Sequence, residues 1–62
     1  MVAHRFKIGQ TVYLDRSLVV PGGAYIVTKK LPERGGEFEY QVKSVNEPHE
    51  RVVLESQLKT EP

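Results

Sequence analysis

A chain of 62 residues suffices for one small domain, near the lower limit at which a protein buries enough apolar surface to fold alone. It contains no cysteine and only two histidines, which excludes a disulfide framework and argues against a structural zinc site. Nine lysines and arginines balance eight acidic residues, so the net charge of +1 excludes a polycation that is drawn to nucleic acid by its overall charge.

The hydrophobic pattern favours a cytoplasmic protein. No apolar run approaches the about 20 residues of a membrane span, and the opening MVAHRFKIG lacks the apolar core of a signal peptide. We therefore expect one domain over residues 1–62, without a cofactor, a small-molecule substrate or a membrane partner. Residues 1–5 show no repeat period and are expected to form a frayed or loosely docked lead-in.

The first strand is expected within FKIGQTVYL. Val12 and Leu14 alternate with Thr11 and Tyr13, and we assign Val12 and Leu14 to the core face. Tyr13 then lies either exposed, where its ring and hydroxyl suit binding, or packed against the following hairpin. The sequence leaves both alternatives open.

A connecting segment, DRSLVVPGG, follows and closes in a Pro- and Gly-containing turn. Three consecutive apolar residues in a loop must be covered, and here these are Leu18, Val19 and Val20. They either fold over one open end of the domain or meet another chain. The second alternative makes them candidates for a protein interface.

Residues 24–45 are predicted to form a β-hairpin around which the rest of the chain is organised. Apolar and polar residues alternate on both sides of PERGG, in which Pro32 disfavours ladder pairing and the two glycines supply the backbone freedom of a turn. With the turn between Arg34 and Gly35, the expected cross-strand pairs are Leu31 with Phe38, Val27 with Val42 and Lys30 with Glu39. This register puts Lys29 on the face of Tyr40, so we expect either a bulge near Lys29 or an open end from which its ammonium reaches water.

The last third of the chain predicts a turn, a strand and one helical turn. Asn46 and Pro48 mark a turn at NEPHE, and residues 51–53 suit a strand. ESQL is expected to form a single helical turn that inserts Leu58 into the core. Residues 59–62 are expected to add a few paired residues.

This order of elements resembles an SH3-like barrel. The resemblance implies an all-β fold: a small SH3-like barrel of about five short antiparallel strands with a one-turn 3-10 helix near the C-terminus. The phrase KSVNEPHERVVLESQL is also similar to small uncharacterised bacterial proteins of this size, from which no function is implied. The matching features run from Phe6 to Leu58 and are Gly9 and Val12 in the first strand, a long first loop, the hairpin from Tyr25 to Val42, a short strand at residues 51–53 and the final helical turn.

The charges are unevenly distributed along the chain. Residues 1–36 carry six basic and two acidic residues, whereas residues 37–62 carry three basic and six acidic residues. Pairing across adjoining strands explains this pattern, and the alternative is a basic surface around Tyr13 that binds RNA. That surface would consist of Arg5, Lys7, Arg16, Lys29, Lys30, Arg34 and Lys43.

No catalytic or metal-binding residue is expected. The one dense cluster of titratable groups is Glu47, His49, Glu50 and Arg51, and its place on a turn favours surface ion pairs. The chain has no cysteine nucleophile, and its serines lack a triad-like setting.

One enzyme family has to be compared. The plasmid-borne type of dihydrofolate reductase is also a small SH3-like barrel, and its pore strand resembles Val-Gln-Ile-Tyr. The corresponding residues here, 51–54, are Arg-Val-Val-Leu, so the ligand-contacting residues do not carry over. We therefore expect no enzymatic activity.

Binding functions remain. The first expectation is a protein-interaction module, which would use Leu18, Val19, Val20 and Tyr13 or a sheet edge to which an extended peptide adds. RNA binding through the basic set is the alternative, and a homo-oligomeric structural subunit is a second one. The expected partner is another protein or a second copy of the chain, with RNA as the alternative.

Overall fold

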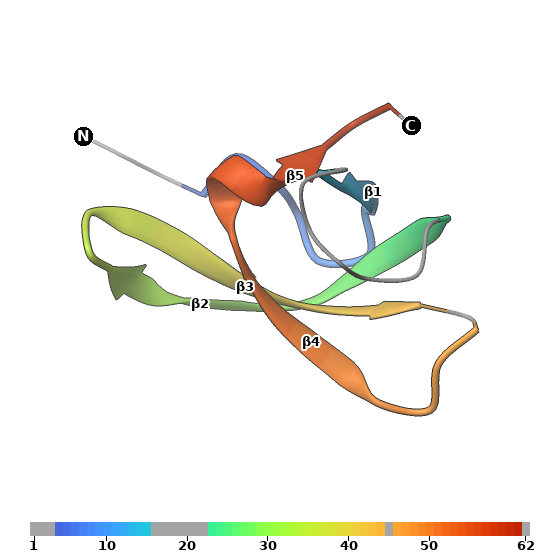
Figure 1. The fold of residues 1–62 in the computed structure, drawn as a ribbon. Helices are drawn as coiled ribbons and strands as arrows, with labels where there is room; N and C mark the ends of the chain where they lie inside the picture. Colours follow the sequence, from blue (N-terminus) through green and yellow to red (C-terminus); the bar gives the residue numbers. More distant parts are fainter. Residues whose placement is uncertain (1–3, 16–22, 45, 62) are drawn as a thin grey trace.

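The computed structural model describes residues 4–15, 23–44 and 46–61, which form one antiparallel sheet and a single helical turn (Figure 1). The sheet has five strands in the order β4-β3-β2-β1-β5. Its elements are β1 (Thr11–Leu14), β2 (Ala24–Arg34), β3 (Glu37–Ser44), β4 (Glu50–Leu54), the 3-10 turn η1 (Glu55–Gln57) and β5 (Leu58–Lys59). The predicted all-β class, the antiparallel strands and the 3-10 turn are confirmed. No described helix is long and apolar enough to cross a membrane.

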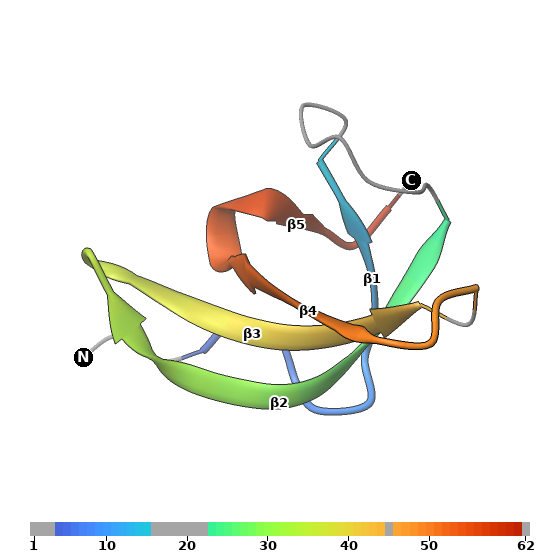
Figure 2. The ribbon, with the colours of Figure 1, turned by 60° about the horizontal axis from the view of Figure 1, so that its bottom comes forward.

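The sheet is strongly bent, so that β1 and β5 lie over the layer formed by β2, β3 and β4 (Figures 1 and 2). The margins of the sheet are β4 and β5, and η1 joins them directly in sequence. Among the described strands these two margins do not pair with one another. One edge of β4 therefore has no neighbouring strand in the described part of the chain.

The core fills the space between the two layers. Alternation places Val12, Val27 and Val42 on the inner face, where all three are fully buried, and Leu14 packs partly buried against them. Leu58 enters the core directly after η1, as the sequence predicts. The full cluster of buried apolar residues is Phe6, Val12, Tyr25, Val27, Tyr40, Val42, Val53 and Leu58.

The hairpin of β2 and β3 follows the predicted register at one end only. Val27 pairs with Val42 as expected. Of the two alternatives expected for Lys29, a bulge or an open end, the bulge is present, at Thr28. A second bulge at Pro32 shifts the register again, so the predicted pairs of Leu31 with Phe38 and of Lys30 with Glu39 are wrong. Leu31 lies opposite Glu39, Lys30 opposite Tyr40 and Phe38 opposite Glu33.

Pro32 and the turn explain why the register of β2 and β3 differs from the predicted one near the turn. Proline has no N–H to donate to a ladder, and a bulge lets β2 continue past it to Arg34. Gly35 and Gly36 have φ values of 62° and 87° and form the two-residue turn between Arg34 and Glu37. Positive φ at both positions is the requirement of the tight hairpin turn that matches the twist of the strands.

The described part of the predicted lead-in, His4 and Arg5, contacts the sheet. The His4 ring stacks on Phe38 with 4.0 Å between ring centroids, and His4 Nε2 donates to the Leu31 carbonyl oxygen at 2.8 Å. The Arg5 N–H donates to Glu55 Oε2 at 3.0 Å. These contacts place Phe6, the next residue, in the core.

Candidate functional site

Glu47 organises a polar cluster at the turn between β3 and β4. Arg51 binds its carboxylate with two hydrogen bonds, from Nε to Oε1 at 2.9 Å and from Nη2 to Oε2 at 2.6 Å. The Tyr25 hydroxyl donates to Oε1 at 3.5 Å, and His49 Nε2 lies 3.7 Å from Oε2. The predicted pair of Arg51 with a neighbouring carboxylate is present, but the Glu47 side chain is only 8% exposed.

The contacts of this cluster shift the pKa values of Glu47 and Tyr25 in opposite directions. The bidentate Arg51 hydrogen bonds hold the pKa of Glu47 below its ordinary value. Burial, followed by the charge of Glu47, raises the pKa of Tyr25. A carboxylate that is kept ionised and accepts hydrogen bonds on both oxygens is a poor proton acceptor. Its contacts with Tyr25 and Arg51 tie the turn to β2 and β4.

A second polar cluster joins η1 to residues 4–10, the described residues before β1, which we call the N-terminal segment. The Tyr40 hydroxyl donates to Glu55 Oε2 at 2.5 Å and accepts the N–H of Phe6 at 3.3 Å. Burial raises the pKa of Glu55, but the hydrogen bonds from Tyr40 and the Arg5 N–H outweigh it, so the pKa lies below its ordinary value. Burial and the hydrogen bond to Glu55 raise the pKa of Tyr40. In the part of the chain described here, no group of His, Asp and Glu side chains is arranged to hold a metal ion.

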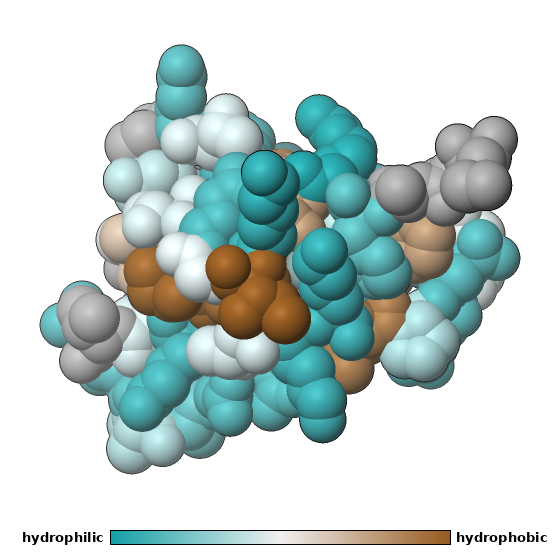
Figure 3. Space-filling view, turned by 180° about the vertical axis from the view of Figure 1, so that it is seen from behind, coloured by the Kyte–Doolittle hydropathy of each residue, from teal (hydrophilic) through white to brown (hydrophobic). Residues whose placement is uncertain are grey.

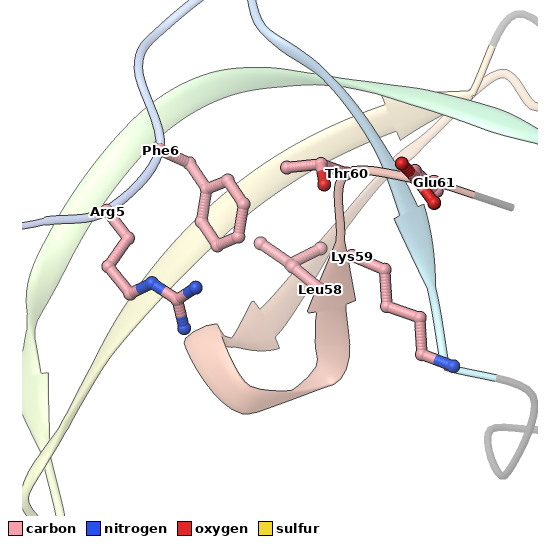
Figure 4. Close-up of a pocket in the computed structure, with 6 residues that line it drawn as sticks. All are labelled: Arg5, Phe6, Leu58, Lys59, Thr60 and Glu61. Atoms are coloured by element: carbon pink, nitrogen blue, oxygen red, sulfur yellow. The ribbon is translucent and has the colours of Figure 1, made fainter.

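A pocket of about 350 Å³ lies between the N-terminal segment and the end of β5 (Figure 4). The ring of Phe6 and the side chain of Leu58 point toward one another, whereas the side chain of Lys59 runs toward β1 and away from Arg5 (Figure 4). The two basic groups of the pocket, on Arg5 and Lys59, therefore do not converge on one point. The lining residues are Arg5, Phe6, Leu58, Lys59, Thr60 and Glu61.

The predicted interface residues fall partly outside the described ranges. Leu18, Val19 and Val20, together with Arg16, lie in the segment 16–22, which the structure does not describe. Tyr13 is half-buried in β1, where it pairs with Ala24 on one side and with Lys59 on the other.

The predicted basic residues are not gathered on one face. In β2, Lys29 lies opposite Gln41 on the outer face of the sheet, away from the core, whereas the adjacent Lys30 lies opposite the buried Tyr40. Lys43 starts from the same outer face as Lys29, because it lies two residues from Gln41 along β3. The remaining described members are Arg34, which pairs with Glu39 at 3.9 Å, and Arg5 and Lys7 in the N-terminal segment.

A sheet edge is one of the interfaces that the sequence analysis expects, and the structure has one at β4, which pairs with β3 alone among the described strands. The Leu54 N–H donates to Gln57 Oε1 at 2.9 Å, so it points away from β3. The Gln41 carbonyl accepts the Thr28 hydroxyl at 3.0 Å and so faces β2, which makes Gln41 and Val52 a pair without hydrogen bonds between β3 and β4. Both observations place the N–H and C=O of Val52 on the free edge of β4.

Val52 also presents its side chain. It is 58% exposed, and Ile8 is the other large apolar residue that is exposed in the described part of the chain. Figure 3 shows apolar side chains gathered in a small cluster on one face and surrounded by hydrophilic ones. In the sequence Val52 and Val53 are equivalent members of an apolar run, and only the register with β3 decides that Val53 faces the core.

The chain matches no protein-family model, no curated protein and no solved structure. The functional argument therefore rests on the geometry of the chain itself.

Proposed function

We propose that this chain is a non-enzymatic protein-interaction module that binds an extended segment of another protein by adding it as a strand to β4. The observation that carries the proposal is the free edge at Val52, where an outward N–H and C=O lie beside an exposed apolar side chain. Unpaired edge groups of this kind form main-chain hydrogen bonds to an added strand, and neighbouring side chains supply specificity.

The hydrogen-bonded carboxyls of Glu47 and Glu55 also support binding over catalysis. The two carboxyls whose pKa is lowered, Glu47 and Glu55, are bound by hydrogen bonds that hold the turn and η1 in place. Catalytic acids and bases need a pKa near the working pH, which these contacts oppose. Their role is to position β4 and its edge.

A second copy of the chain fits this edge less well than a foreign segment does. In an antiparallel pair of two β4 strands, a two-fold axis at Arg51 would place the two Arg51 side chains directly opposite one another. An axis at Val52 would need the Leu54 N–H, which Gln57 already occupies. A foreign strand needs only the outward groups of Glu50 and Val52.

The test compares Val52→Pro with Val52→Thr. Proline removes the outward N–H without removing a ladder bond to β3, and an edge position tolerates it, whereas threonine keeps the N–H and the β-branched shape. Extended peptides selected by phage display on the wild-type protein are titrated into labelled protein and followed by two-dimensional amide NMR.

We expect localised shifts at Glu50 and Val52, loss of binding in Val52→Pro and retained binding in Val52→Thr. Binding that survives in a folded Val52→Pro would overturn the proposal. Amide shifts near Lys29 and Lys43 on addition of RNA, weakening with salt, would favour nucleic-acid binding instead, because log affinity for a polyanion falls with log salt.

A further inference from the structure

We infer that Gln57 limits the length of the segment that β4 binds, so that the paired stretch is three residues long and carries an apolar residue opposite Val52. This inference rests on the proposed strand addition and deepens it, because it states which stretch the edge takes and which residue sets the limit. It follows from the hydrogen bonds at the two ends of the free edge.

The edge closes toward η1 at Leu54. The N–H of this residue points to the side where an added strand would place a carbonyl oxygen, but it already donates to Gln57 Oε1 at 2.9 Å. Leu54 is also the N-cap residue of η1, and the carbonyl of an N-cap residue accepts the first hydrogen bond of its helix. An added strand therefore finds no free main-chain group at Leu54.

The turn between β3 and β4 limits the edge at its other end. Glu50 is the first residue of β4, and Pro48, two residues earlier, has no N–H to donate. Arg51 lies between the outward positions, and its main-chain groups face Val42 of β3. Within β4, Glu50 and Val52 are thus the residues that can exchange main-chain hydrogen bonds with a partner, and together they span a stretch of three residues.

Val52 decides which side chain the stretch carries. Its own side chain is 58% exposed on the outer face, and the partner residue directly opposite would have its Cβ about 5.5 Å or less away. An apolar side chain at this position covers Val52 and removes both apolar surfaces from water. The Glu50 carboxylate contacts the Thr28 hydroxyl of β2 and so faces away from the added strand.

Gln57 also has a structural role, because its bond to the Leu54 N–H is one half of a capping box at the start of η1. Loss of that role alone would lower stability without making affinity depend on the length of the bound segment. The dependence of affinity on peptide length therefore distinguishes a limit on the edge from a cap on η1.

The experiment compares two peptides with blocked ends, Val-Thr-Thr and Thr-Thr-Val-Thr-Thr. In an antiparallel addition, which is slightly more stable than a parallel one, the two added N-terminal residues reach Leu54. Each peptide is titrated into the wild type, Gln57→Ala and Gln57→Glu and followed by two-dimensional amide NMR. Glutamate keeps the acceptor oxygen and is the matched control for alanine.

We expect the wild type and Gln57→Glu to bind both peptides equally well, because the Leu54 N–H stays occupied. Gln57→Ala should bind the longer peptide about two- to ten-fold more tightly, the range of one net hydrogen bond. Val-Thr-Thr-Thr-Thr, which is extended past Glu50 instead, should gain nothing in any of the three proteins. Replacing valine by threonine should weaken binding of either peptide.

The outcomes separate the two levels of the proposal. A gain from the N-terminal extension in the wild type, or no gain in a folded Gln57→Ala while Val52→Pro still abolishes binding, would overturn the length limit and keep strand addition. Equal binding of the threonine peptides would overturn the apolar preference. If both peptides bind Val52→Pro as tightly as the wild type, strand addition itself fails. The wild-type comparison stands even if Gln57→Ala does not fold.

Discussion

Tyr40 shows how one hydroxyl connects three parts of this small chain. It donates to Glu55 in η1 and accepts the N–H of Phe6, while its own backbone lies in β3. Removing this hydroxyl takes the acceptor from the buried Phe6 N–H and one hydrogen bond from the partly buried Glu55 carboxylate.

Tyr40→Phe should therefore lower the free energy of unfolding by about 1–3 kcal/mol, the cost of leaving buried polar groups unsatisfied. Tyr13→Phe is the matched control, because the Tyr13 hydroxyl has no hydrogen-bond partner among the described residues. Urea unfolding followed by far-UV circular dichroism measures both variants. Equal stability of the two variants would show that the hydroxyl contacts of Tyr40 contribute nothing.

The Glu47 carboxyl predicts a pH dependence of stability. Its pKa is lowered in the folded state by the Arg51 hydrogen bonds, so the unfolded chain binds a proton more readily than the folded one. The resulting stabilisation is present above the ordinary glutamate pKa of about 4.3 and is lost as the pH falls through the folded value.

Glu47→Gln should accordingly be less stable than the wild type at neutral pH and should show a weaker loss of stability in acid. Some acid dependence remains in this variant, because Glu55 also has a lowered pKa. Thermal unfolding between neutral pH and pH values below the ordinary pKa tests this, with Glu33→Gln as the control. Parallel acid profiles for wild type and Glu47→Gln would contradict the assignment.

Among the elements, the strands were predictable because their signals are local. Alternation fixes β1 and its buried Val12, and the run after the NEPHE turn fixes β4. The end of that run also fixes η1, since Leu58 has to return to the core. The conflict of Lys29 with the alternating pattern predicted an irregularity, either a bulge or an open end, and the pairing of β2 with β3 shows that it is a bulge at Thr28.

The features that the sequence did not predict depend on how the strands pair and not on the alternation within one strand. The bulge at Pro32 leaves the sequence pattern unchanged but moves the pairing of Leu31 by one residue. The exposure of Val52 likewise depends on how β4 pairs with β3, which neither strand encodes alone. The separation of Lys29 from Lys30 was predictable in principle, because adjacent residues in a strand point to opposite faces.

For the whole molecule, the size of the core decides how large a loss of stability the fold can tolerate. A chain of this length rarely gains more than about 3–5 kcal/mol from a single core. Phe6 contributes to that core from outside the sheet, in an edge-to-face contact with Tyr40 at 5.5 Å between ring centroids. The N-terminal segment is thus part of the domain and carries a substantial share of its stability.

Phe6→Ala should leave the protein largely unfolded at 25 °C, because truncating a buried phenylalanine costs about 3–5 kcal/mol, the whole stability expected of such a core. Ile8→Ala is the matched control two residues away, since the Ile8 side chain is 63% exposed and its truncation should change stability by no more than about 0.5 kcal/mol. Far-UV circular dichroism and amide dispersion at 25 °C distinguish the two variants. A cooperative, wild-type-like transition in Phe6→Ala would mean that the sheet is stable without its N-terminal segment, and the fold would then rest on β1 to β5 alone.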